Sequence, residues 1–123
     1  MRISAYHVAR VGTAITYLWI GVLILKDPSL WFGYVRPWAQ SLLPVSLLTT
    51  LTLVAIFDII IGFLFLIQRW IWPASALAAL HLIVVLIVAG INEITVRDIG
   101  ILATTLALFI NTVPPRWFNW FKK

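Results

Sequence analysis

The sequence predicts an all-α integral membrane protein, a single domain over residues 1–123 whose four helices cross the bilayer as an up-down bundle. Its 123 residues are 63% hydrophobic and only 11% charged. A soluble domain of this size could not hide so much apolar surface from water, because small domains bury the smallest share of their surface. The apolar residues also gather into four long runs, and a bilayer core about 30 Å thick needs roughly 20 apolar residues per helix.

Prolines and charges mark the ends of these runs. Pro28 stops the first run, since proline cannot continue a helix. Pro73 is well placed in the first turn of the third, and Pro114 and Pro115 end the fourth. We therefore expect transmembrane helices at about residues 6–25, 45–67, 72–89 and 96–113.

Two further segments are rich in aromatic residues. The first, residues 28–44, has few basic residues, and the second, the tail, has several. Residues 28–44 form the longest connection and carry Trp31, Tyr34 and Trp38. Aromatic rings favour the headgroup region, so we predict an interfacial or re-entrant segment. The tail, residues 114–123, is aromatic and basic, and we expect it to lie on the membrane surface against anionic lipid.

Basic residues predict the orientation. With four spans, one side of the membrane carries six Lys and Arg residues and the other carries three. The positive-inside rule then places both termini in the cytoplasm and the protein in the cell (inner) membrane as a multi-pass protein. We read the net charge of +5 as this topology signal and expect no nucleic-acid partner. The two sets are Arg2, Arg10, Arg69, Arg116, Lys122 and Lys123, against Lys26, Arg36 and Arg97.

Small and polar residues mark the helix faces that should pack together, because lipid provides no hydrophobic drive between helices. Each run carries one such stripe at helical spacing. The stripes form either a plain packing surface or a surface that also encloses a small polar cavity. Their members are Arg10, Thr13, Tyr17 and Gly21; Ala55, Asp58 and Gly62; Ala74, Ala78 and His81; and Arg97, Thr104 and Asn111.

Asp58 is the strongest functional candidate, because an acid in the bilayer centre costs about 2.5–3.5 kcal/mol and needs an inward-facing partner. Asp58 and His81 lie at similar distances in sequence from the turn at residues 68–71. At about 1.5 Å per residue, both reach a similar depth in an antiparallel hairpin. Such a pair could lock the helices together, share a proton, or bind a ligand such as a quinol hydroxyl. A haem held by His7 and His81 is rejected, because His7 lies at the end of its helix.

Arg10, Tyr17 and Arg97 complete the candidates for ligand binding or proton transfer. Arg10 and Arg97 either snorkel to headgroups or shape the two mouths of the bundle. There are no cysteines, and we find no catalytic triad, phosphate-binding loop or metal-spaced cluster. The sequence therefore predicts no catalytic or metal-ligating residue and no independent enzyme.

Three stretches resemble DoxX-like membrane proteins: residues 10–28, which open on Arg10 and close on Gly21 and Lys26; residues 56–64 around Asp58; and residues 96–102 with Arg97. That family more often has Glu where this chain has Asp58. The resemblance implies a four-helix membrane subunit, and some relatives belong to quinone-linked oxidoreductases. We therefore expect an accessory or anchoring subunit of a membrane complex, with quinone as the one candidate cofactor. The alternative is a small transporter or a protein that binds lipid or another hydrophobic ligand. Expected partners are lipids, other subunits or further copies of the chain.

Overall fold

A computed structural model describes residues 4–116, and within this range all the regular secondary structure is helical, with no β-strand. Arg2 and residues 117–123, which carry most of the predicted surface tail, lie outside the described residues. The 3₁₀ helix η1 and the short α2 both fall within the segment predicted to be interfacial. The elements are α1 (Ala5–Lys26), η1 (Pro28–Tyr34), α2 (Pro37–Gln40), α3 (Leu47–Leu66), α4 (Ile71–Ala89) and α5 (Val96–Thr112).

The four long helices begin and end within two residues of the predicted positions. Two of them start at a serine cap: the hydroxyl oxygens of Ser4 and Ser46 accept hydrogen bonds from the backbone of His7 and Thr49, which satisfies free N–H groups of the first turn. Three of them, α1, α3 and α4, are long and apolar enough to cross a membrane. The fourth, α5, has 17 residues.

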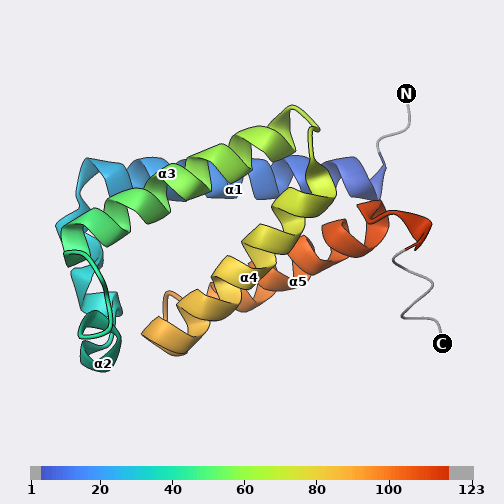
Figure 1. Cartoon of the computed structure of the whole chain (residues 1–123). Helices are drawn as coiled ribbons and strands as arrows, with labels where there is room; N and C mark the ends of the chain where they lie inside the picture. Colours follow the sequence, from blue (N-terminus) through green and yellow to red (C-terminus); the bar gives the residue numbers. More distant parts are fainter. Residues whose placement is uncertain (1–3, 117–123) are drawn as a thin grey trace.

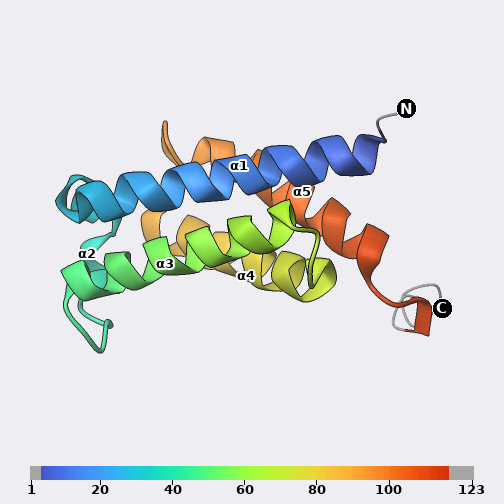
Figure 2. The ribbon, with the colours of Figure 1, turned by 90° about the horizontal axis from the view of Figure 1, so that it is seen from above.

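The long helices form two antiparallel pairs (Figure 1). One pair is α1 with α3, and the other is α4 with α5; these are the two most extensive helix contacts in the structure. The pairs approach each other near the ends of α3 and α5 and diverge toward the opposite end, where η1 and α2 lie (Figure 1). Seen from above, α1 and α3 run side by side along their length (Figure 2). The space between the diverging pairs is where the candidate site is found.

Two glycines bring α1 and α3 into close contact. A Cβ atom on Gly21 would lie 2.8 Å from the Ala55 carbonyl oxygen, and one on Gly62 would lie 2.9 Å from the Ala14 carbonyl oxygen. Ala14 and Ala55 are fully buried. Each helix thus presents one alanine and one glycine seven residues apart. Because the helices are antiparallel, the glycine of each helix lies against the alanine of the other. Gly21, Ala55 and Gly62 lie in this contact as predicted; Ala14 was not among the predicted packing residues.

The inward face of α4 agrees with the prediction, whereas that of α5 does not. Ala74 and Ala78 are 2% and 0% exposed. In α5 the buried side chains are Thr105 and Leu108. Thr104 is partly exposed and Asn111 is exposed, so the stripe predicted for this helix is wrong. Arg97 and Thr104 of this stripe instead line a groove between α5 and α1.

Arg10 does not snorkel to the membrane surface, and that interpretation is wrong. Its side chain is buried, and Nη1 donates hydrogen bonds to the carbonyl oxygens of Phe65 at 2.6 Å and Leu66 at 3.0 Å. Nη2 lies 3.3 Å from Nδ1 of His7. The last carbonyls of a helix have no partner within the helix and carry partial negative charge. Arg10 therefore caps the end of α3.

The connection between α1 and α3 is fastened to the far end of α4. The backbone N–H of Arg36 donates to the Val88 carbonyl at 3.2 Å, and its Nε donates to the Ala89 carbonyl at 3.3 Å. Gly90 follows with a φ of 73°, and any Cβ there would collide with the Arg36 guanidinium. This arrangement holds η1 and α2 across the gap between the two helix pairs.

Candidate functional site

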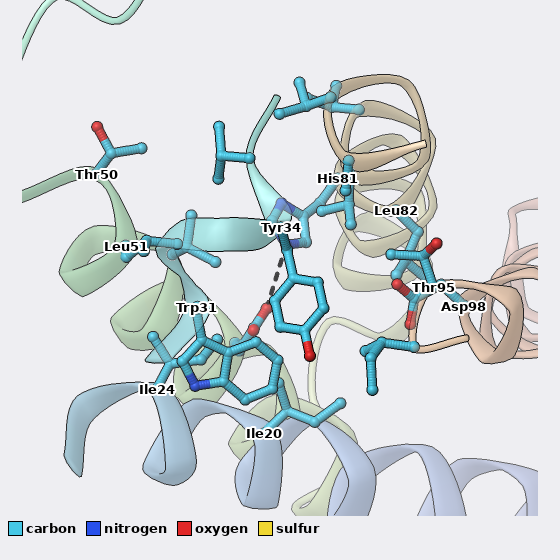
Figure 3. Close-up of a pocket in the computed structure, with 18 of the residues that line it drawn as sticks. Ile20, Ile24, Trp31, Tyr34, Thr50, Leu51, His81, Leu82, Thr95 and Asp98 are labelled. Carbon is cyan, nitrogen blue, oxygen red and sulfur yellow. Dashed lines mark ion pairs between the residues drawn. The ribbon is translucent and has the colours of Figure 1, made fainter. Parts of the chain in front are cut away.

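An apolar cavity of about 280 Å³ lies between the two helix pairs. Side chains from α1, η1, α3, α4 and the start of α5 line it (Figure 3). Because η1 contributes two of its aromatic rings, the connection predicted to be interfacial also forms a wall of this chamber. Representative wall residues are Ile20, Ile24, Trp31, Tyr34, Leu51 and Leu82.

Asp58 and His81 are the buried polar pair of the cavity. His81 Nε2 lies 3.5 Å from Asp58 Oδ1, the contact drawn as a dashed line in Figure 3. Asp58 is 4% exposed, and its Oδ1 has no hydrogen-bond partner. The pair thus has an ion-pair distance without the geometry of a hydrogen bond. The pairing expected from equal depth in the α3–α4 hairpin is observed. It leaves Oδ1 of the Asp58 carboxylate without a hydrogen-bond donor.

Aromatic contacts fix the side chains around this pair. The His81 ring lies against Phe57, with ring centroids 5.0 Å apart. Tyr17, which also lines the cavity, is 4% exposed and donates its hydroxyl to the Ala78 carbonyl at 3.4 Å. That bond links α1 to α4 across the space between the helix pairs. Tyr17 therefore joins Asp58 and His81 in one chamber, although the three residues come from three helices.

The turn between α4 and α5 brings further polar groups to the cavity. The Asn92 side chain accepts hydrogen bonds from the backbone of Ile94 and Thr95, and the Thr95 hydroxyl donates to the Gly90 carbonyl. This network fixes where α5 begins. Arg97 and Asp98, in the first turn of α5, line the cavity as a result.

Four of the five predicted site residues line one cavity: Tyr17, Asp58, His81 and Arg97. Arg10 does not, because it is engaged at the end of α3. Sequence reasoning missed Trp31, Tyr34 and Asp98 as cavity residues. The aromatic content of residues 28–44 was the available signal for the first two, but it predicted only an interfacial or re-entrant segment.

The chemistry open to this chamber is binding and proton transfer. Within residues 4–116, no three His, Cys, Asp or Glu side chains come together as a metal site. An apolar wall with a few convergent polar groups is the usual composition of a small-molecule site. Comparison of the chain with protein-family models, with curated proteins and with solved structures found no match in any of the three.

Proposed function

We propose that this protein binds a small hydrophobic ligand inside the membrane, in the cavity between its two helix pairs. The observation that carries this proposal is the unsatisfied carboxylate oxygen of Asp58 inside an otherwise apolar chamber. A buried polar group without a partner costs free energy, and a ligand headgroup that donates a hydrogen bond to this oxygen, or places a positive charge against it, would recover that free energy. The volume of about 280 Å³ suits a small molecule or the head portion of a longer one.

The ligand would enter from the acyl-chain region. Large apolar side chains cover the outer faces of α1, α3 and α4, among them Trp19, Leu53 and Leu80, so these helices are solvated by lipid. A hydrophobic ligand partitions into the same region. The DoxX-like resemblance makes a quinone one candidate, and a lipid or a transported hydrophobic molecule is another.

A purification experiment tests this function. Val54 lines the cavity, whereas its neighbour Leu53 is 58% exposed on the outside of the same helix. Val54→Trp should fill the chamber, and Leu53→Trp should add the same side chain to the lipid-facing surface. After purification in mild detergent, mass spectrometry should find one hydrophobic small molecule with the wild type and with Leu53→Trp, and at least about tenfold less with Val54→Trp. Equal amounts in all three proteins would contradict the proposal.

We also propose that the chain crosses the inner membrane four times, with both termini in the cytoplasm. The excess of Lys and Arg on that side supports this orientation. The helix α5 is about 25 Å long at 1.5 Å per residue, which a locally thinned bilayer accommodates. A cysteine introduced at exposed Gln68 should be shielded from an impermeant maleimide in intact cells, and one at exposed Glu93 should be labelled. Labelling of the cysteine at position 68 alone would show the opposite orientation, with both termini outside the cytoplasm.

A second candidate function is an accessory or anchoring subunit of a membrane complex. A groove between α1 and α5 supports it, lined by Gly12, Thr16, Gly100 and Thr104. In lipid, small and polar residues of this kind mark helix contacts. If a partner helix or a second copy lies there, Gly100→Leu should abolish a stoichiometric complex that Val54→Trp leaves intact. A complex lost with Val54→Trp and retained with Gly100→Leu would argue against the groove.

A further inference from the structure

The cavity carries more acid than base. Two carboxylates line it, those of Asp58 and Asp98, against one arginine, Arg97. With both acids ionised and His81 neutral, these lining groups would sum to a charge of −1. The chain as a whole has a formal net charge of +5, so ionised acids would give the chamber the opposite sign to that of the protein.

Neither carboxylate makes an ion pair with a lysine or arginine in the described part of the chain. Asp58 Oδ1 has His81 at 3.5 Å and no hydrogen-bond donor. Asp98 is half-buried, and no ion pair to its carboxylate is found in the described part of the chain. Its neighbour Arg97 turns back along the chain, where Nε donates to the Ile94 carbonyl at 3.2 Å. The positive side chain at the mouth is thus held by a backbone carbonyl.

Two aromatic rings form the wall contributed by η1. Trp31 and Tyr34 have ring centroids 5.8 Å apart and planes tilted by 51°, and both line the cavity. In Figure 3 the rings of Trp31 and Tyr34 lie next to the dashed contact made by His81, and Asp98 lies on the side of the cavity formed by α5. Aromatic faces attract cations, with Trp the most favourable ring.

We propose that the ligand of this cavity is a small hydrophobic organic cation, an amine or quaternary ammonium compound. This inference rests on the proposed ligand-binding function and names its substrate class. The charged head lies between Asp58 and Asp98, against the rings of Trp31 and Tyr34. The apolar body lies along Ile20 and neighbouring aliphatic side chains. An anionic head would meet two carboxylates in a site of low dielectric, where like charges repel strongly.

Two probes of nearly identical shape separate charge from hydrophobicity. Benzyltrimethylammonium carries a positive nitrogen where neopentylbenzene has a carbon. We would titrate each into the full chain in phosphatidylcholine nanodiscs, with empty nanodiscs as the reference. The wild type should bind the cation at least about tenfold more tightly than the neutral probe, because only the cation gains from the carboxylates and the rings.

Substitutions of single acids assign the binding site. Asp58→Asn and Asp98→Asn should each weaken cation binding at least about tenfold while leaving binding of the neutral probe unchanged. Glu93→Gln is the matched control, since Glu93 is exposed and lies outside the cavity lining. Thermal unfolding of each variant checks that it folds. If Asp58→Asn does not fold, the half-buried Asp98 still provides the test.

The outcomes separate this inference from the function on which it rests. Equal affinity for the two probes would overturn the cation proposal and leave hydrophobic-ligand binding standing. A wild-type preference for the cation that survives both Asp substitutions would overturn the assignment to these acids. Binding of neither probe would overturn the cation proposal, and the Val54→Trp experiment would then decide the broader function separately.

Discussion

Gly62→Leu should be the most damaging single substitution on the α1–α3 contact, with an expected loss of about 3 kcal/mol or more of unfolding free energy. A Cβ at this position would lie 2.9 Å from both the backbone oxygen of Ala14 and the backbone nitrogen of Leu18. Backbone atoms cannot rotate away as a flexible side chain can, so the two helices would have to separate. Gly21→Leu should act in the same way, because the Ala55 carbonyl faces it.

Unfolding in mixed micelles with increasing sodium dodecyl sulfate, followed by tryptophan fluorescence, measures this effect. Gly12→Leu is the matched control, since a Cβ at Gly12 meets nothing within 4 Å. That control should unfold at or above the wild-type detergent fraction, because leucine has the higher helix propensity. If Gly62→Leu and Gly12→Leu unfold at the same detergent fraction, the close approach of α1 and α3 is not what stabilises this helix pair.

Arg10→Met should cost about 2–4 kcal/mol of unfolding free energy. The substitution keeps an apolar stem of similar length but removes the guanidinium that donates to the carbonyls of Phe65 and Leu66. Hydrogen bonds from a charged donor contribute about 1.5–3 kcal/mol, and the buried acceptors would be left without a partner. Arg10→Lys should recover only part of the loss, because a single ammonium that donates to the two carbonyls cannot also replace the Nη2 contact with His7.

The same detergent titration measures this prediction. Arg69→Gln serves as the control, since Arg69 is an exposed arginine at the end of α3. It should change stability by no more than about 0.5 kcal/mol, as surface substitutions usually do. If Arg10→Met unfolds at the same detergent fraction as the wild type, the hydrogen bonds of Arg10 do not stabilise the end of α3.

The shape of the fold explains why a chain of this length can hold an internal chamber. Parallel packing of all four long helices would leave little space between them. Here the two antiparallel pairs diverge toward one end (Figure 1), and η1 fills only part of the opening. Arg36 fastens that segment to the end of α4, so the wall bearing Trp31 and Tyr34 depends on this contact. The cavity is therefore a product of helix divergence and of the long first connection together.

Much of the local structure followed from residue order alone. The ends of the long helices lie where Pro28, Pro73 and Pro114 occur, because proline constrains a helix in the same way in any fold. The closeness of Asp58 and His81 also followed from the sequence, since a tight turn and a fixed rise per residue set their depths. The all-α class and the length of α1, α3 and α4 needed only composition and hydropathy. These properties depend on short-range geometry.

The rotation of α5, the role of Arg10 and the aromatic wall were decided by tertiary structure. Heptad spacing placed Thr104 and Asn111 on one face but could not say whether that face meets α4; Thr105 and Leu108 are buried instead. Arg10 caps α3 because folding brings the end of α3 beside it, 55 residues away along the chain. Trp31 and Tyr34 line the cavity because the helix pairs diverge beside η1. Rotations and crossing angles come from packing between distant segments, and periodicity within one segment carries no information about them.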